Sequence, residues 1–249
     1  MTSQAQPPAP HGMDDPDGYE AWQARSRLVL TPVAAPSILG LFGFGAATFT
    51  VASNLAEWWG NAVTSPVVLA PFAIFLGGLA QLLAGMWAYR ARDGLATAMH
   101  GIWGAFWLAW GLLMLLTATG VLSPVLLDSQ ALGFWFIALG VITLFGALGA
   151  TAQNMGLFLT LILLTAGSGL LAAAYIGTLH NVRIAAGWVL VASSAAAFYT
   201  AGAMLLEQSF GGRVVLPLGK WSLSGNVPGR RVVRDIGYSA GMPGARAGQ

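Results

Sequence analysis

The chain of 249 residues contains no cysteine. Disulfide bonds, thiolate nucleophiles and cysteine metal sites are therefore excluded, and the redox compartment cannot be read from cysteine usage. The sequence also lacks the phosphate-binding loop GxxxxGK followed by Ser or Thr, the zinc motif HExxH, and paired histidines of the kind that bind haem. Because no nucleophile–base pair or cluster of metal ligands emerges, we expect neither an enzyme nor a cofactor.

Charge is the second scarce property. Charged residues make up 8% of the chain, against about 25% in a typical soluble domain, and hydrophobic residues make up 56%. Seven charged residues lie between Leu28 and Gln208, and all of them fall where long apolar runs begin or end. The few basic residues lie toward the ends of the chain, so nothing favours a nucleic acid as partner.

Six apolar runs are long enough to cross a lipid bilayer at a rise of about 1.5 Å per residue. They must be helices, because hydrocarbon offers no partner for free backbone groups. We predict an all-α, polytopic membrane protein, a six-transmembrane-helix bundle over residues 31–220. The predicted spans are 36–56, 66–89, 95–118, 131–150, 156–178 and 184–206. Pro71 is expected to kink the second helix.

Lys and Arg are distributed unequally across the predicted membrane. Ten lie in the two tails and in the loop between the second and third spans, whereas only Arg183 lies on the other side. The positive-inside rule then predicts that the N- and C-termini are both cytoplasmic. Residues 1–30 lack the pattern of a cleavable signal peptide and are expected to be a disordered tail. Residues 221–249 are expected to be a flexible, basic tail.

The predicted spans carry no Asp, Glu, Lys or Arg at mid-depth. Ion-coupled pumps commonly use such groups as relays or binding sites. A narrow channel or facilitator needs only shape and a few polar groups, which fits this sequence better. His100 is the titratable candidate within a span. It is either a proton-linked switch or a neutral histidine that bonds to a neighbouring helix.

Gln81 is the clearest buried polar residue of the second span. Its amide needs a partner in an apolar setting, so it either binds a substrate or bridges two helices. Further polar candidates are weaker, because a hydroxyl can bond to the preceding helical turn. They are Thr48, Asn54, Thr97, Thr143 and Thr165.

Three motifs occur in the same order as in a known family. Residues 35–45 read APSILGLFGFG, similar to NPAPLGLxGFG; residues 77–85 read GGLAQLLAG, similar to GGxAQxxAG; and residues 210–219 read FGGRVVLPLG, similar to FGRxVLPxG. Over about residues 35–220 the chain resembles the acetate uptake transporter family. That family includes the bacterial succinate–acetate permease and the yeast acetate and ammonia export proteins.

The resemblance implies a homo-hexamer of six-helix protomers in the bacterial inner (plasma) membrane, each protomer with its own pore. A Phe, a Tyr and a Leu close that pore at mid-membrane. By position Phe44 matches the Phe, Leu164 matches the Leu, and Trp103 stands at the Tyr. An indole keeps an N–H donor but adds bulk, so we expect slower flux or altered selectivity. The family match favours a pore role for Gln81.

The function expected from the resemblance is passage of acetate and related short-chain monocarboxylates, with succinate as a further candidate. Acetate is almost wholly ionised at neutral pH. Inward movement of the anion costs about 2.3 kcal/mol per 100 mV of inside-negative potential. Uptake therefore needs a gradient, cellular consumption, or symport of a proton. Without an intramembrane carboxylate, an anion channel or passage of the protonated acid is easier to accommodate.

Two other functions remain open. A membrane-embedded structural or accessory subunit would keep the fold and lack transport. This hypothesis rests on Ala35, Ile38, Ala88 and Trp103, which depart from the family pattern. Export of ammonia or ammonium is the third hypothesis, and it is implied by the yeast members of the family.

Overall fold

The computed structural model describes residues 33–61, 64–123, 129–221 and 226–229. Within these ranges six helices are long and apolar enough to cross a membrane, so the all-α, six-span fold is confirmed. Their bounds are Pro36–Leu55, Val67–Ala91, Gly94–Ala118, Gln130–Ala150, Met155–Gly177 and His180–Ser209. The last helix differs most from its predicted range, since it begins at His180 rather than 184. The predicted tail at 1–30 and most of that at 221–249 lie outside the described residues.

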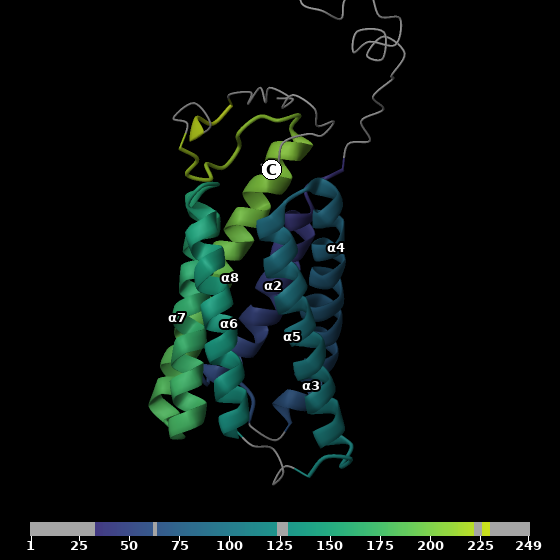
Figure 1. The fold of residues 1–249 in the computed structure, drawn as a ribbon, viewed down its shortest axis with the longest axis vertical. Helices are drawn as coiled ribbons and strands as arrows, with labels where there is room; N and C mark the ends of the chain where they lie inside the picture. The colour runs from purple at the N-terminus through teal and green to yellow at the C-terminus, as the bar shows by residue number, and fades with distance from the viewer. Residues whose placement is uncertain (1–32, 62–63, 124–128, 222–225, 230–249) are drawn as a thin grey trace, which may run out of the picture. The chain divides into compact units, whose positions relative to one another are not determined.

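The helices lie side by side (Figure 1), and the contacts between neighbouring helices join them in a closed ring. Its members are α2 (Pro36–Leu55), the second span with α3 (Ser65–Phe72), η1 (Ala73–Ala80) and α4 (Gln81–Ala91), then α5 (Gly94–Ala118), α6 (Ser129–Ala150), α7 (Met155–Gly177) and α8 (His180–Ser209). Around the ring α2 packs on α8, α8 on α7, α7 on α6, and the second span on both α2 and α5. The contact between α5 and α6 closes the ring, and it is smaller than the contacts between the other neighbouring helices.

The second span changes its helix type along its length. Pro71 has no N–H to donate to the preceding turn, and a π-helical segment, η1, begins at Ala73. The disturbance expected from Pro71 therefore takes the form of a wider helix rather than a break. Small residues then bring α4 and α5 together, because a Cβ at Gly85 would lie 2.8 Å from the backbone nitrogen of Gly101.

The segment after α8 folds back onto the turn between α6 and α7. Backbone N–H groups of Met155 and Gly156 donate to the carbonyl oxygens of Gly219 and Leu218, both at 3.1 Å. The Asn154 side chain accepts from Leu157 N at 2.9 Å. These bonds satisfy donors that the first turn of α7 leaves without helical partners. The motif at 210–219 thus ends in a cap for α7.

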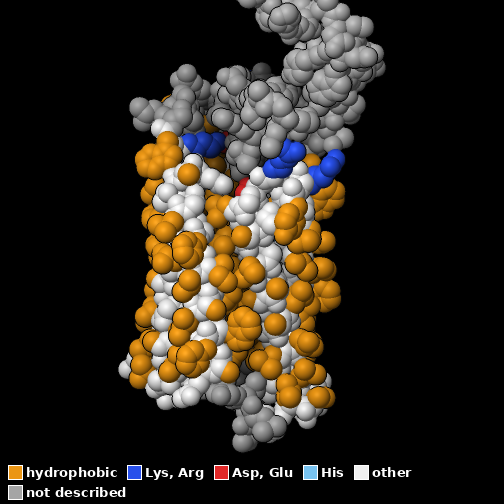
Figure 2. All heavy atoms as spheres, viewed as in Figure 1, with side chains coloured by type: hydrophobic (Ala, Val, Ile, Leu, Met, Phe, Trp, Pro, Cys, Tyr) orange, Lys and Arg blue, Asp and Glu red, His pale blue; other side chains and the backbone are white. Residues whose placement is uncertain are grey.

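Apolar side chains cover the length of the helices on the face drawn in Figure 2, with Lys and Arg gathered at one end. Arg90 lies in the last turn of α4 and Lys220 follows α8, both at the end where α2 begins. Arg183 contacts Glu57 just beyond the other end of α2. The basic residues therefore divide between the ends as the sequence predicts. Which end faces the cytoplasm stays a prediction.

We expect Gly219→Ala to destabilise the protein more than Gly211→Ala. Both glycines have positive φ, 69° and 64°, so both alanines cost backbone strain of about 1–2 kcal/mol. A Cβ at Gly219 would also lie 2.7 Å from Met155 Cβ, whereas one at Gly211 meets nothing within 4 Å. Thermal unfolding in detergent measures the difference, and equal losses would contradict the proposed cap.

Candidate functional site

A cavity of about 410 Å³ lies within the ring of helices. Residues of α2, α3, α5, α6, α7 and α8 line it, and most of them are apolar or aromatic. Its polar lining residues are Thr48, Asn54, Ser168, Tyr175 and Arg183, with three indoles, Trp103, Trp107 and Trp110. A mostly apolar chamber with a few polar groups is typical of a small-molecule site.

A second, smaller cavity of about 30 Å³ lies toward the opposite end of the ring. Ser37 in the first turn of α2, the N-cap residue Asp93 of α5 and Gln153 in the turn before α7 line it, and His100 lines it farther along α5. The His100 ring packs on Gly40, where an added Cβ would lie 2.4 Å from the ring. The structure therefore places His100 in a tight helix contact beside this cavity.

A buried layer separates the two cavities. The small cavity is lined as far as Leu41 on α2, His100 on α5 and Leu161 on α7. The lining of the large cavity starts at Thr48, Trp103 and Leu164 on the same three helices.

Phe44 falls between these two sets of residues, and it joins Trp103 and Leu164 in one buried cluster. The three side chains are at most 4% exposed. The Phe44 and Trp103 ring centroids are 6.4 Å apart, with an interplanar angle of 68°. We call Phe44, Trp103 and Leu164 the central layer.

The indole of Trp103 is fixed by α6. Its Nε1 donates to Thr143 Oγ1 at 3.0 Å, and this hydroxyl donates to the Leu139 carbonyl at 2.6 Å. Thr143 is fully buried. The indole N–H of Trp103, which the sequence marks as a possible donor to a substrate, is therefore already hydrogen-bonded to the protein in this conformation.

Gln81 is buried in the second span, next to α2. Its side chain is 1% exposed, and it is not among the described residues that line either cavity. The amide Nε2 donates to the Gly77 carbonyl at 2.9 Å, within the π-helical turn that precedes it. A Cβ at Gly43 of α2 would lie 3.6 Å from Gln81 Cγ, so the side chain sits where the second span crosses α2.

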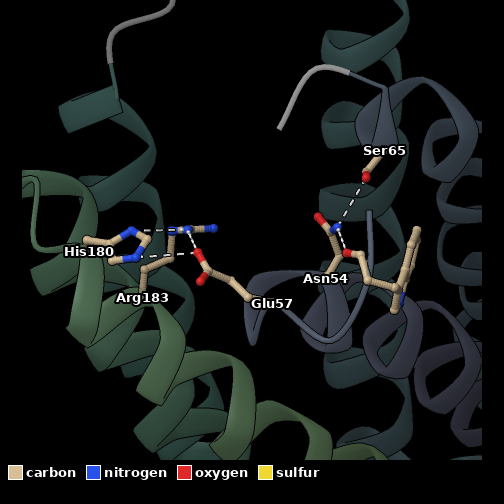
Figure 3. A network of polar contacts seen from close by, with 6 residues as sticks. Asn54, Glu57, Ser65, His180 and Arg183 are labelled. Carbon is tan, nitrogen blue, oxygen red and sulfur yellow. Dashed lines mark hydrogen bonds and ion pairs between the residues drawn. The ribbon is translucent and has the colours of Figure 1, made fainter. Parts of the chain in front are cut away.

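Figure 3 shows a charged cluster of Glu57, His180 and Arg183. Arg183 of α8 lines the large cavity, and its Nη2 lies 2.8 Å from Glu57 Oε1. His180 lies beside both, with Nε2 3.4 Å from the same carboxylate oxygen. Glu57 adopts a left-handed conformation, φ 62°, where the chain leaves α2. Sequence reasoning missed this cluster, since Arg183 counted only toward orientation.

Three buried polar atoms of the large cavity have no hydrogen-bond partner among the described residues. They are Thr48 Oγ1, Trp107 Nε1 and Ser168 Oγ. The expectation that threonines bond to their own helix holds for Thr165, whose hydroxyl donates to Leu161 O at 2.9 Å, but not for Thr48. No sequence signal distinguishes Ser168 or the Trp107 indole from residues that pack helices.

Six membrane-spanning helices around a mostly apolar chamber are typical of a membrane channel or transporter. The chain belongs to the GPR1/FUN34/yaaH family, whose sequence model matches residues 23–218. The resemblance drawn from the three motifs is thereby confirmed.

Relatives carry the names of transporters and channels rather than of enzymes. The chain is 32% identical over 190 residues to the succinate-acetate/proton symporter SatP of Escherichia coli K12, covering 76% of this chain and 97% of that one. It is 32% identical over 143 residues to ammonia transport outward protein 2 of Saccharomyces cerevisiae, covering 55% and 49%. A solved structure of the bacterial acetate channel SatP matches with a TM-score of 0.70 at 29% identity, covering 76% and 100%. The chain is a multi-pass membrane protein.

We expect Thr143→Val to destabilise the protein by about 1–3 kcal/mol, because it leaves the buried Trp103 N–H without an acceptor. Thr160→Val is the matched control, since Thr160 is also buried and its hydroxyl donates only to the Gly156 carbonyl of its own helix. Thermal unfolding of both variants in detergent measures the effect. Equal stability of the two variants would contradict a structural role for the Trp103–Thr143 bond.

Proposed function

We propose that this protein is a channel or transporter for acetate and related short-chain monocarboxylates, with one pore in each protomer. The observation that supports it most is the cavity of about 410 Å³ inside one protomer, which reaches the central layer at Trp103 and Leu164. The similarity to SatP supports acetate, and the name of that relative makes succinate a further candidate.

Phe44, Trp103 and Leu164 form the constriction in this proposal. An acetate methyl group tolerates an apolar, aromatic passage, whereas its carboxylate loses hydration there at a large cost. The described part of the central layer offers no charged group to offset that cost. Passage of the acid together with its own proton avoids the cost. Net movement of the protonated acid is equivalent to proton symport.

In this proposal the charged cluster of Glu57, His180 and Arg183 lies at one entrance of the pathway and attracts the substrate there. Arg183 attracts an anion toward the large cavity, while Glu57 limits how tightly the anion is held there. Their side chains are 31% and 47% exposed, so water and salt weaken both effects. Weak attraction at an entrance suits conduction, because a permeating solute must also leave.

Gln81 has a supporting role in this account. Its amide closes the π-helical turn on Gly77 and packs against α2 beside Gly43. We assign it to bridging the helices that carry the constriction, which is one of the two roles open from the sequence. We further propose cytoplasmic termini, an inner-membrane location and a homo-hexamer. The hexamer rests on the family resemblance.

Uptake of labelled acetate into proteoliposomes tests the proposal. We expect uptake above that of protein-free vesicles, increasing when the outside pH is lowered because more of the substrate carries its proton. Absence of uptake by intact, correctly assembled protein would refute the function. The fold would then serve as a structural or accessory subunit.

Export of ammonia or ammonium is the second candidate, favoured by the similarity to ammonia transport outward protein 2. Labelled methylammonium in the same vesicles separates the two. Movement of methylammonium without acetate would replace the carboxylate proposal.

We expect Trp103→Tyr to raise acetate flux several-fold, because the smaller ring widens the central layer and its hydroxyl can still donate. Trp110→Tyr is the control, since Trp110 lines the same cavity away from that layer. Initial uptake rates at a fixed acetate gradient measure both variants. Unchanged flux in Trp103→Tyr would remove Trp103 from the constriction.

A further inference from the structure

The three unpartnered polar atoms share one position relative to the central layer. Thr48 follows Phe44 by four residues, Trp107 follows Trp103 by four, and Ser168 follows Leu164 by four. Four residues make about one helical turn, a rise of about 6 Å, and place each pair on one face of its helix.

The three helices also run in the same direction between the two cavities. Along each of α2, α5 and α7, the lining of the small cavity comes first and that of the large cavity second. A step of one turn therefore moves all three side chains to the same side of the central layer. We call Thr48, Trp107 and Ser168 the polar level: each lies one helical turn from the central layer, on the side of the large cavity, and each lines that cavity.

These polar groups are buried where water competes least. Thr48 and Trp107 are 4% exposed, and Ser168 is fully buried. Most buried polar atoms in folded proteins have partners, so three exceptions in one cavity point to a ligand. Thr50 on α2 and Thr165 on α7 instead donate to carbonyls of their own helices, at 2.8 and 2.9 Å.

The Trp107 indole is held rigidly. Its ring lies edge-to-face with Phe106 and Trp110, at centroid distances of 5.4 and 5.8 Å. A Cβ at Gly77 would lie 2.5 Å from Trp107 Cγ, so this glycine of η1 makes room for the ring. A donor fixed by packing costs little entropy when a ligand binds it.

The chemistry of the three groups selects an acceptor. An indole N–H can only donate, and each hydroxyl can donate one hydrogen bond. No Asp or Glu is among the described residues that line this cavity. We propose that Thr48, Trp107 and Ser168 bind the carboxylate of the permeating acid one turn above the constriction, with the methyl group toward Phe44, Trp103 and Leu164. This assignment rests on the proposed function and names the groups that recognise its substrate.

Uncharged hydrogen-bond donors suit a binding site that a permeating anion must also leave. A lysine or arginine at this depth would hold an anion too firmly for release, whereas uncharged donors replace part of its hydration and let it leave. The same donors accommodate the protonated acid, because its carbonyl oxygen still accepts and its hydroxyl can donate to Thr48 or Ser168.

The test uses full-length protein and two readouts. Thr48→Val, Trp107→Phe and Ser168→Ala are compared with Thr50→Val, Trp110→Phe and Thr165→Val, each a control on the same helix. The first readout is the acetate concentration for half-maximal uptake in proteoliposomes. The second is the dissociation constant of ¹³C-acetate from detergent-solubilised protein by NMR, which needs no transport. Size-exclusion chromatography verifies assembly.

We expect each of the three variants to raise both concentrations about tenfold, the effect of losing one hydrogen bond to a charged acceptor. Controls should stay within about twofold, and Thr48→Ser, which keeps the hydroxyl, should behave like wild type.

If the wild type transports acetate but the three variants match their controls in both readouts, the binding level is refuted and the transport function stands. If the wild type binds acetate without transport and the variants weaken binding, the binding level stands and the transport function fails. Absence of both binding and transport refutes both.

Discussion

The structure depends on one constraint: inside a bilayer, every polar group must find its partner within the protein. The backbone meets the constraint as six helices, and most buried hydroxyls meet it on their own helical turns. Trp103 meets it across helices, through Thr143. Thr48, Trp107 and Ser168 are the exceptions among the described residues, and each of them lines the large cavity. The places where the constraint is not met by the protein are therefore the places to expect a substrate.

In the proposed function, the central layer and the polar level each select for a different property of the permeating solute. In that function, Phe44, Trp103 and Leu164 exclude hydrated ions because they offer only apolar surface and one indole whose N–H is already hydrogen-bonded. The polar level favours solutes that accept hydrogen bonds. A short monocarboxylic acid satisfies both, since one end is apolar and the other is an acceptor. Selectivity of this kind needs no buried charge, which agrees with the lack of Asp, Glu, Lys and Arg at mid-depth in the spans.

The sequence predicted the six spans well, because the length and hydropathy of an apolar run follow directly from bilayer thickness. The family resemblance also singled out Phe44, Trp103 and Leu164 as a constriction. The structure brings the rings of Phe44 and Trp103 into contact and buries all three residues, and their role as a constriction stays a prediction. It did not predict the π-helical form of η1, since helix type after Pro71 depends on local hydrogen bonding. Nor did it single out Trp107 and Ser168, because periodicity does not say which face of an apolar helix meets a cavity. The pair Glu57–Arg183 joins residues 126 apart in the chain, and neither residue signals the other.

The central claim is that the pathway runs inside a single protomer. Anomalous diffraction from crystals soaked in bromoacetate tests it most directly, because bromine marks the position of the acid. The account predicts a bromine peak in the large cavity, close to Trp103 and Leu164, in every protomer. Peaks confined to the surfaces between protomers, with the cavity unoccupied at saturating bromoacetate, would contradict it.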